Sequence, residues 1–293
     1  MRPIYANTVI QIEITNACHL SCANCTRFVG HHKSPFFMDL ETVRKAIDSL
    51  EGFPGRVGIM GGEPCLHPKF LDILAIMREM IPDRRRREFW TAGYKWDEYK
   101  ADILATFDED RIAYNDHTQH NGRHQPLLVA SDEMVEDPEL RKQLIDNCWV
   151  QNQWSASITP KGGFFCEIAA ARSHLLDGPM GYPIERGWWK KTPAEFQDQV
   201  EWACGGCSAP IPMETRPDGR GGRDGATVDQ VSPRQLIQLL KAGSPKARRG
   251  QVEILTHKPT PEEIAAFKAK WTPSHFRPFE AHKPEDYSAA PTA

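Results

Sequence analysis

The sequence predicts an α/β fold built around a mostly parallel sheet, followed by a region of different character. Two observations lead to this prediction. Strand and helix patterns alternate through residues 8–150, and the alternation stops near Cys148, where a predicted hairpin follows. Repeated strand–helix units of this size favour a parallel sheet with right-handed crossovers, either a full or partial barrel or an open doubly wound sheet. In both architectures, catalytic residues gather at the C-terminal ends of the strands.

The predicted elements follow in order along the chain. Apolar, β-rich runs predict strands at 9–14, 57–60, 88–91, 111–114 and 127–130. Apolar residues at helical spacing predict helices at 39–50, 70–80, 99–107 and 137–147. Beyond these we expect a hairpin over 155–166, helices at 168–176, 193–203 and 231–242, and an extended proline-rich tail from 258. The expected divisions of the chain are 1–147, 148–257 and 258–293.

The composition excludes several classes of protein. The 293 residues carry a formal net charge of −3, and 40% of them are hydrophobic. This balance supports a sizeable core and disfavours nucleic-acid binding, which needs a basic surface. The sequence has no run of about 18 apolar residues and no signal-peptide layout at its start, so we expect a cytoplasmic protein without a membrane span. In that compartment, clustered cysteines indicate metal or redox chemistry rather than disulfides.

Two motifs lie directly after the first and second predicted strands. The first is a CxxxCxxC pattern made by Cys18, Cys22 and Cys25. Three thiolates on one loop can bind three irons of a [4Fe–4S] cube and leave the fourth iron free. A zinc site, which usually has four protein ligands, and a coincidental grouping remain open on spacing alone. The second motif, Gly61-Gly62-Glu63-Pro64, allows a ligand to approach the backbone and offers a carboxylate to an ammonium group.

Together the two motifs resemble those of the radical S-adenosylmethionine superfamily. The resemblance implies a partial (β/α)6 TIM-like barrel in which Cys18, Cys22 and Cys25 bind a [4Fe–4S] cluster. It also implies that S-adenosylmethionine chelates the free iron and that one-electron reduction yields a 5′-deoxyadenosyl radical. The residues implied to bind the methionine amino group are Gly61, Gly62, Glu63 and Pro64. A reducing partner such as flavodoxin or ferredoxin is implied as well.

At the expected nucleoside contacts, this sequence departs from the pattern of the superfamily. Many members of the superfamily have an aromatic residue immediately before the last cysteine, to pack on the adenine, and Asn24 stands in that position. We expect its amide to hydrogen-bond the adenine instead. Asn115 and Ser131, near later strand ends, are our candidates for ribose contacts, with ordinary turn or cap roles as the alternative.

Four further cysteines lie beyond the strand–helix region, namely Cys148, Cys166, Cys204 and Cys207. The last two form a CxxC knuckle whose glycines let successive N–H groups turn toward sulfur. The pattern resembles the twitch domain, the shortened form of the SPASM extension, which holds an auxiliary [4Fe–4S] cluster with a hairpin, a helix and a CxxC. The hairpin spacing is one residue shorter than in that family. A zinc site and four unrelated buried cysteines are the alternatives.

Cys65 is the one cysteine outside both groups, directly after the GGEP motif. Either it is a small core residue, or it is a thiol that donates a hydrogen atom near the radical, as in epimerases of the superfamily. Polar loop residues expected at the active face are further candidates for substrate binding, with solvated loops as the alternative. They are His31, His32, Asn115, Asp116, His117, His120, Asn121, Arg123 and His124.

The resemblance implies an enzyme that abstracts hydrogen from its substrate and uses the auxiliary cluster as an electron acceptor or relay. Oxidation and epimerisation are both compatible with these motifs. Because the first predicted strand begins at Val9, we expect no N-terminal peptide-recognition domain, which favours a small polar substrate such as a sugar or aminocyclitol. Modification of a ribosomally made peptide is the alternative, and a non-catalytic iron–sulfur electron-transfer protein is a distant one.

Overall fold

A six-stranded sheet forms the centre of the molecule in the computed structural model, which describes residues 1–114, 123–213, 216–217 and 227–270. The strand order is β4-β3-β2-β1-β6-β7. All neighbouring strands run parallel except β6 and β7, which form an antiparallel hairpin. The predicted mixed α/β fold with a mostly parallel sheet is therefore confirmed. The strands are β1 (Val9–Thr15), β2 (Arg56–Gly61), β3 (Arg87–Thr91), β4 (Ile112–Tyr114), β6 (Ala156–Thr159) and β7 (Gly162–Phe164).

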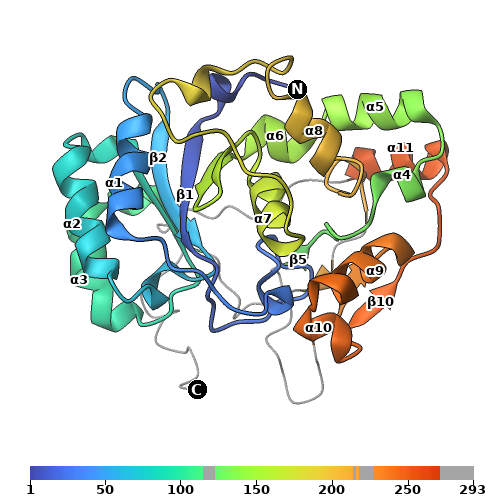
Figure 1. Cartoon of the computed structure of the whole chain (residues 1–293), viewed down its shortest axis with the longest axis horizontal. Helices are drawn as coiled ribbons and strands as arrows, with labels where there is room; N and C mark the ends of the chain where they lie inside the picture. The colour runs from blue at the N-terminus through green and yellow to red at the C-terminus, as the bar shows by residue number, and fades with distance from the viewer. Residues whose placement is uncertain (115–122, 214–215, 218–226, 271–293) are drawn as a thin grey trace.

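Three helices connect the first four strands, as the apolar spacing predicts. They are α1 (Leu40–Ser49), α2 (Phe70–Met80) and α3 (Trp96–Thr106), and they lie in sequence along one side of the molecule (Figure 1). The first helix begins where the carboxylate of Asp39 accepts a hydrogen bond from the Thr42 N–H at 2.7 Å, a typical N-cap. Its apolar stripe, with Val43 and Ile47, is buried against the sheet.

The position of β6 differs from expectation. The predicted strand at 127–130 is wrong, because these residues leave the sheet and only Leu128 forms a bridge, to Val231. Instead β6 pairs with β1, with Ile10 opposite Ala156 and Ile12 opposite Ile158. A short apolar run indicates burial but not the partner against which it is buried. The predicted hairpin does form, and because it extends the main sheet, the division expected at 147 does not coincide with an edge of that sheet.

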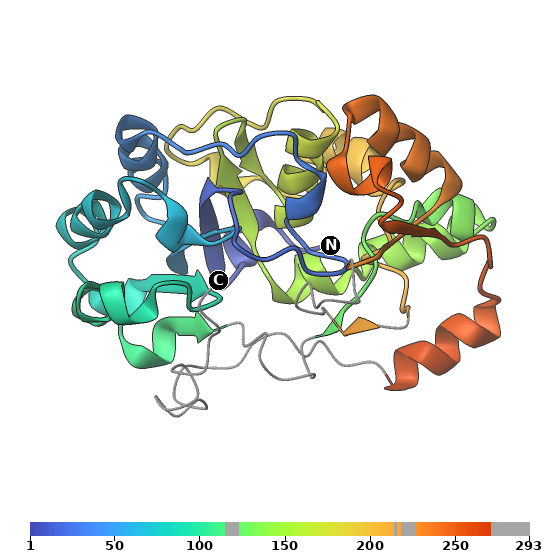
Figure 2. The same cartoon turned by 90° about the horizontal axis from the view of Figure 1, so that it is seen from below.

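Helices and short strands follow the first four strands and surround the hairpin. The helices are α4 (Ser131–Met134), α5 (Pro138–Asp146), α6 (Trp149–Gln153), α7 (Glu167–Leu175), α8 (Gln197–Ala203), α9 (Pro233–Ala242), α10 (Pro245–Arg248) and α11 (Pro261–Lys270). Two small sheets pair β9 (Asp229–Val231) with β10 (Val252–Ile254) and β5 (Arg123–His124) with β8 (Arg216–Pro217). Short 3-10 helices span Ile4–Ala6, Val29–His31, Pro64–Leu66, Arg84–Arg86, Glu109–Arg111 and Trp188–Lys190. Figure 2 shows α9 and α10 at the opposite end of the molecule from α1–α3.

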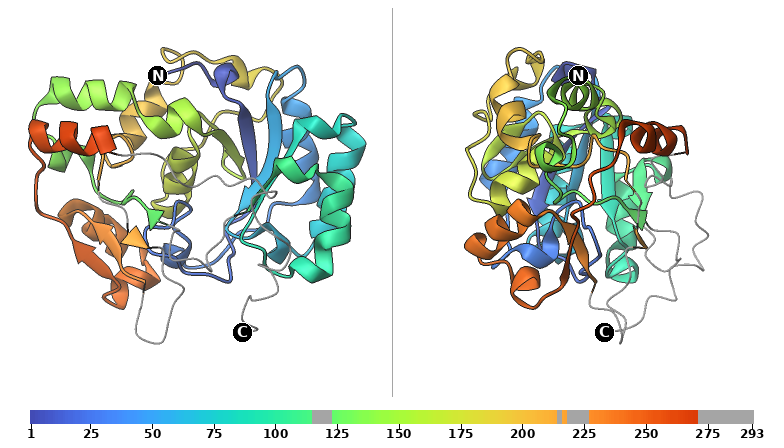
Figure 3. Two further views of the ribbon diagram at one scale, coloured as in Figure 1. Left: turned by 180° about the vertical axis from the view of Figure 1, so that it is seen from behind. Right: turned by 90° about the vertical axis from the view of Figure 1, so that its right-hand side faces the viewer.

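The tail expected to be extended from 258 begins with a helix instead. The N-terminus of α11 is a capping box, in which the Thr260 N–H donates to the Glu263 carboxylate at 2.7 Å and the Glu263 N–H donates to the Thr260 hydroxyl at 3.2 Å. Ile264 packs into a small apolar cluster beside α4 and α5, and Figure 3 shows α11 alongside them. Residues 271–293 of the predicted tail lie outside the described part of the chain. No helix among the described residues is long and apolar enough to cross a membrane.

Candidate functional site

The two N-terminal motifs come together at the C-terminal edge of the sheet. The loop after β1 carries Cys18, Cys22 and Cys25, and these three cysteines line one cavity together with Gly61 and Gly62 from the end of β2. The end of β3 contributes to the same cavity. This convergence follows from the topology, because the C-terminal ends of parallel strands lie along one edge of their sheet. Cys22 is buried and the other two cysteines are partly exposed.

The two glycines allow the strand ends to pack closely. A β-carbon on Gly61 would lie 2.2 Å from the Thr15 carbonyl oxygen, and one on Gly62 would lie 2.3 Å from that of Ala17. The Gly62 N–H donates to the Thr15 carbonyl at 2.9 Å, and the Glu63 N–H donates to the Ala17 carbonyl at 2.7 Å. From the sequence, the glycines were expected only to let a ligand approach the backbone. The structure adds that the glycines hold the GGEP segment against the start of the cysteine loop.

Glu63 is fully buried and turned toward the end of β3. Its carboxylate accepts hydrogen bonds from the Thr91 hydroxyl at 2.8 Å, the Ala92 N–H at 2.7 Å and the Cys65 N–H at 3.2 Å. Burial raises the pKa of this carboxyl, and these donors oppose the rise. Burial and the Glu63 charge both raise the pKa of the Cys18 thiol. A thiolate at Cys18 therefore needs a positive partner such as a metal, and three thiols on one loop are a suitable donor set for an iron–sulfur cube.

A buried charged network holds the C-terminal part of the cysteine loop. Arg27 contacts the carboxylate of Glu13 on β1 at 2.5 Å and that of Glu167 on α7 at 3.0 Å. Ser157 donates to Glu13 at 3.0 Å, and Ser155 donates to Glu167 at 2.6 Å. This network of buried ion pairs was not predicted from the sequence. The available signal was in β1, where Glu13 is a charged residue within a strand that is buried throughout.

Asn24 makes its hydrogen bonds within the protein. It has a left-handed backbone with φ of 50°, a conformation that asparagine tolerates better than most residues. Its N–H donates to Asp229 at 2.7 Å, and its amide oxygen accepts from the Gln230 N–H at 2.9 Å. The amide nitrogen donates to the Gln230 side chain at 3.2 Å. The adenine contact of Asn24 stays a prediction; in the structure this amide is bonded to β9 and does not line the cysteine cavity.

Asp229 links the cysteine loop to the C-terminal part of the chain. Its carboxylate lies 2.5 Å from Nε2 of His31 and 2.9 Å from Nζ of Lys246. Lys246 also donates to the Cys22 carbonyl at 3.0 Å, and Nδ1 of His31 lies 2.7 Å from the Ser244 hydroxyl. His31 is 1% exposed and has partners on both ring nitrogens, so its role as a substrate ligand stays a prediction. These contacts stabilise the loop from the side opposite Arg27.

The remaining predicted loop residues divide between the described and the undescribed parts of the chain. His124 lines the cysteine cavity, with Nδ1 2.9 Å from the Ala23 carbonyl. His32 lies 3.0 Å from the Arg27 carbonyl, and burial lowers its pKa to about 4, so it is neutral at neutral pH. The candidates outside the described residues, or whose side chains are not described, are Asn115, Asp116, His117, His120, Asn121 and Arg123.

The second group of cysteines comes together from three separate segments. The four thiols of Cys148, Cys166, Cys204 and Cys207 line one small cavity at the starts of α6 and α7 and the end of α8. Burial raises the pKa of each thiol, and the nearby thiols raise the pKa values of Cys148, Cys166 and Cys204 further. Four clustered sulfurs in a buried setting need a positive partner to ionise, which suits an iron–sulfur core or zinc. No three His, Cys, Asp or Glu side chains in the described part of the chain converge as ligands of one ion. In an iron–sulfur cube each thiolate binds a different iron, so the four sulfurs do not need to converge on one ion.

Two other predicted site residues lie away from the cavity of the first motif. Ser131 is fully buried, and its hydroxyl donates to the Cys204 carbonyl at 2.8 Å. Its ribose contact stays a prediction, and in the structure this hydroxyl belongs to the surroundings of the second cysteine group. Cys65 is 3% exposed, lies in the main hydrophobic core and does not line the cysteine cavity. That location fits the interpretation of Cys65 as a core residue.

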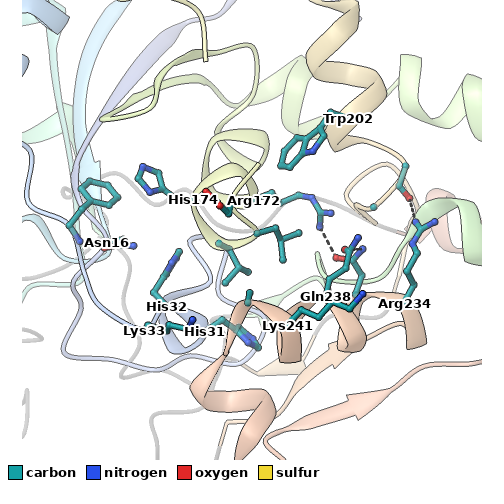
Figure 4. Close-up of a pocket in the computed structure, with 18 of the residues that line it drawn as sticks. Asn16, His31, His32, Lys33, Arg172, His174, Trp202, Arg234, Gln238 and Lys241 are labelled. Atoms are coloured by element: carbon teal, nitrogen blue, oxygen red, sulfur yellow. Dashed lines mark hydrogen bonds between the residues drawn. The ribbon is translucent and has the colours of Figure 1, made fainter. Parts of the chain in front are cut away.

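A larger cavity lies elsewhere and has a volume of about 1100 Å³, against about 80 Å³ at the first three cysteines. We call it the polar cleft (Figure 4). Its wall is formed by the loop after the first cysteine motif, by α7 and α8, and by α9. The labelled residues include His32, Lys33, Arg172, His174, Trp202, Arg234 and Lys241. We place the candidate active site at the smaller cavity, because thiols and strand ends converge there and volume alone carries no chemistry.

Comparisons with known proteins give limited similarity. No protein-family model matches the chain, and no curated protein is significantly similar to it. Among solved structures, BtrN in complex with AdoMet and 2-DOIA is similar with a TM-score of 0.43 and 18% identity, over 68% of this chain and 88% of that one. Selenomethionine BtrN in an open conformation is similar with a TM-score of 0.42 and 16% identity, over 68% of this chain and 86% of that one.

Proposed function

We propose that this protein is a radical S-adenosylmethionine enzyme. The observation that carries the proposal is the cavity shared by Cys18, Cys22 and Cys25 with Gly61 and Gly62, at the C-terminal ends of neighbouring parallel strands. Three thiolates suit three irons of a [4Fe–4S] cube and leave one iron free for another ligand. Charged contacts on two sides hold the loop in place, which a cluster site requires.

The bound cluster would supply one electron to S-adenosylmethionine, which would split into methionine and a 5′-deoxyadenosyl radical. The chain's own residues orient the reactants. Gly61, Gly62, Glu63 and Pro64 form the proposed site for the methionine amino group, where the buried carboxylate of Glu63 provides negative charge. Arg27 and Glu167 line the cavity beside the cysteines and hold the loop against the sheet.

The second cysteine group is proposed to hold an auxiliary [4Fe–4S] cluster with full protein ligation by Cys148, Cys166, Cys204 and Cys207. In an oxidation, the substrate hydrogen atom moves to the deoxyadenosyl carbon. An auxiliary cluster held by these cysteines would accept one electron from the substrate radical, and one proton would pass to solvent. In an epimerisation, the radical regains a hydrogen atom instead. Because Cys65 lies in the core, its location does not support a role as the hydrogen-atom donor of an epimerisation. We therefore favour oxidation.

The proposed substrate is a small polar molecule such as a sugar or aminocyclitol. The lining around the three cysteines supports this class, because it combines the imidazole of His124 and the hydroxyl of Thr91 with the indoles of Trp90 and Trp154. Aromatic faces and hydrogen-bonding groups together suit a hydroxylated ring. A reductant such as flavodoxin or ferredoxin is proposed to deliver the initiating electron.

The test is anaerobic reconstitution with iron and sulfide, followed by metal analysis and addition of reductant and S-adenosylmethionine. We expect about eight irons per chain, for two cubes, and formation of 5′-deoxyadenosine. The Cys65→Ala variant is the matched control, which should keep both. Absence of 5′-deoxyadenosine from fully loaded protein would overturn the proposal. Zinc at the second site would remove the auxiliary cluster and leave the radical chemistry standing.

A further inference from the structure

Arg172 separates the second cysteine group from the polar cleft. It lies on α7, six residues after Cys166, and its side chain lines both the four-cysteine cavity and the cleft. A β-carbon on Gly206 would lie 2.2 Å from the Arg172 Nη2 atom, so the guanidinium lies against the backbone of the CxxC knuckle. Arg172 is only 3% exposed, although the cleft beside it is large. Figure 4 shows it on the wall of the cleft.

Within the described part of the chain, no carboxylate forms an ion pair with Arg172. Its Nη1 donates to the neutral Gln235 side chain at 3.2 Å, and its Nε has no hydrogen-bond partner among the described residues. The nearby carboxylate of Asp132 is instead paired with Arg234. A buried, unpaired guanidinium is costly, so a negative group close to it is expected. Cys204 and Cys207 would provide negative charge of this kind next to the guanidinium once a bound metal cofactor ionises their thiols.

The surroundings of the four cysteines contain little other positive charge. Among the described residues that line their cavity, Arg172 is the one lysine or arginine. The N-terminal ammonium of Met1 also lies near this cavity, but it is exposed and donates to the Asp146 carbonyl. Water and salt screen an exposed charge much more than a buried one. Arg172 is therefore the positive charge that a cofactor bound to these cysteines would experience most strongly.

We propose that Arg172 raises the reduction potential of the auxiliary cluster and so makes it an electron acceptor for the substrate radical. The inference rests on the proposed function, because it requires an iron–sulfur cluster at the second cysteine group. Reduction adds one electron and hence one negative charge to the cluster. A fixed cation nearby stabilises the reduced form more than the oxidised form, and net charge and solvent exposure are known determinants of such potentials.

The test is a redox titration of the reconstituted full-length protein, followed by electron paramagnetic resonance. The auxiliary cluster is the one whose reduced signal does not change when S-adenosylmethionine is added. We expect Arg172→Gln to lower the equilibrium constant for its reduction about tenfold, which corresponds to about 59 mV for a one-electron couple. Arg172→Lys should retain most of the wild-type potential.

Two further variants separate the charge effect from a loss of folding. Gly206→Ala keeps the arginine but displaces its guanidinium from the knuckle, and should lower the potential in the same direction. Arg234→Gln is the matched control in the same cleft, because that side chain is 42% exposed and paired with Asp132. It should leave the potential unchanged within about threefold in equilibrium constant, as expected for a solvated pair. If Arg172→Gln fails to load iron, Gly206→Ala and Arg172→Lys provide the test.

The outcomes distinguish this inference from the proposed function. Two iron–sulfur clusters with an unchanged potential in both Arg172→Gln and Gly206→Ala would overturn the role of Arg172 and leave the auxiliary cluster in place. An equal shift in Arg234→Gln would also overturn it, because the effect would then belong to the cleft as a whole. Wild-type protein without an iron–sulfur cluster at the second site would overturn the proposed function itself.

Discussion

The two cysteine groups are built in opposite ways. The first places three thiols on one short loop of the sequence, with Cys18 and Cys25 partly exposed, and anchors that loop through charged side chains. The second collects four thiols from three distant segments, and three of them are buried. One group is thus a local motif held by the rest of the fold, whereas the other is created by the fold.

The difference separates two kinds of chemistry. A loop with three donors leaves a coordination position open, as catalysis at a metal centre requires. A buried set of four donors closes the coordination sphere and suits electron transfer or storage. The buried arginine beside each cysteine group also differs in its ion pairing. Arg27 forms ion pairs with Glu13 and Glu167, so it fixes geometry, whereas Arg172 has no paired carboxylate among the described residues and is available to act on a cofactor.

The largest effect should come from breaking one group at a time. Cys18→Ala is expected to abolish 5′-deoxyadenosine formation, because the cube would lose one of only three protein ligands. Cys204→Ala should lose the second cluster and product formation but retain cleavage of S-adenosylmethionine. Iron content and nucleoside release, measured on both variants, check the expectation. Cleavage that persists in Cys18→Ala would remove the assignment of the first group.

The next effect concerns the stability of the first loop. Arg27→Gln leaves the buried carboxylates of Glu13 and Glu167 without their cation and should lower the free energy of unfolding by about 3–5 kcal/mol. Arg44→Gln, which breaks an exposed pair with Glu79, is the control and should lower the free energy of unfolding far less, because water and salt screen an exposed pair. Denaturant unfolding of the apoprotein measures both. Equal losses would mean that the Arg27 network is not a special anchor.

A smaller effect is expected from added methyl groups at the two sites. Gly62→Ala places a β-carbon against the Ala17 backbone, which cannot move without shifting the cysteine loop, so we expect a loss of about 1–3 kcal/mol and weaker cluster binding. Gly205→Ala, in the knuckle, meets only the end of the Asp132 side chain at 3.2 Å and should cost about 0.5 kcal/mol or less. Thermal unfolding and iron content compare the two; a larger loss for Gly205→Ala would contradict the close-packing argument.

The smallest effect is expected at the polar cleft. Burial lowers the pKa of both His32 and His174 to about 4, below their ordinary value of 6.5. As the pH falls, these histidines therefore bind protons in the unfolded chain before they do so in the folded protein. The free energy of unfolding should decrease as the pH falls from about 6.5 to 4, and the two residues should have no such effect above that range. His174→Gln should flatten this part of the pH profile of unfolding. His257→Gln, at an exposed pair with Glu263, should not change it. A profile for His174→Gln identical to wild type would contradict the prediction.

The sequence predicted the local features well and the long-range ones poorly. The sequence located β1–β4 because they are short apolar runs that are buried almost throughout, and α1–α3 because their apolar residues recur at helical spacing. The placement of β6 beside β1 is a choice of partner that periodicity does not contain. Arg172 was missed for a related reason. An arginine on a helix is expected at the surface, but almost all of α7 is buried between the hairpin and the polar cleft.

The contacts of Asp229 and Lys246 have a consequence for the order in which the protein matures. The N–H of Asn24, within the cysteine loop, is bonded to a side chain 205 residues later, and the Cys22 carbonyl accepts from Lys246, 224 residues later. Contacts of such sequence separation form late in folding. On the ribosome, the loop at the beginning of the chain must therefore wait for nearly the whole protein to be synthesised. We expect iron–sulfur insertion into this loop to be a post-translational event, with the N-terminal motif among the last parts of the molecule to reach its final form.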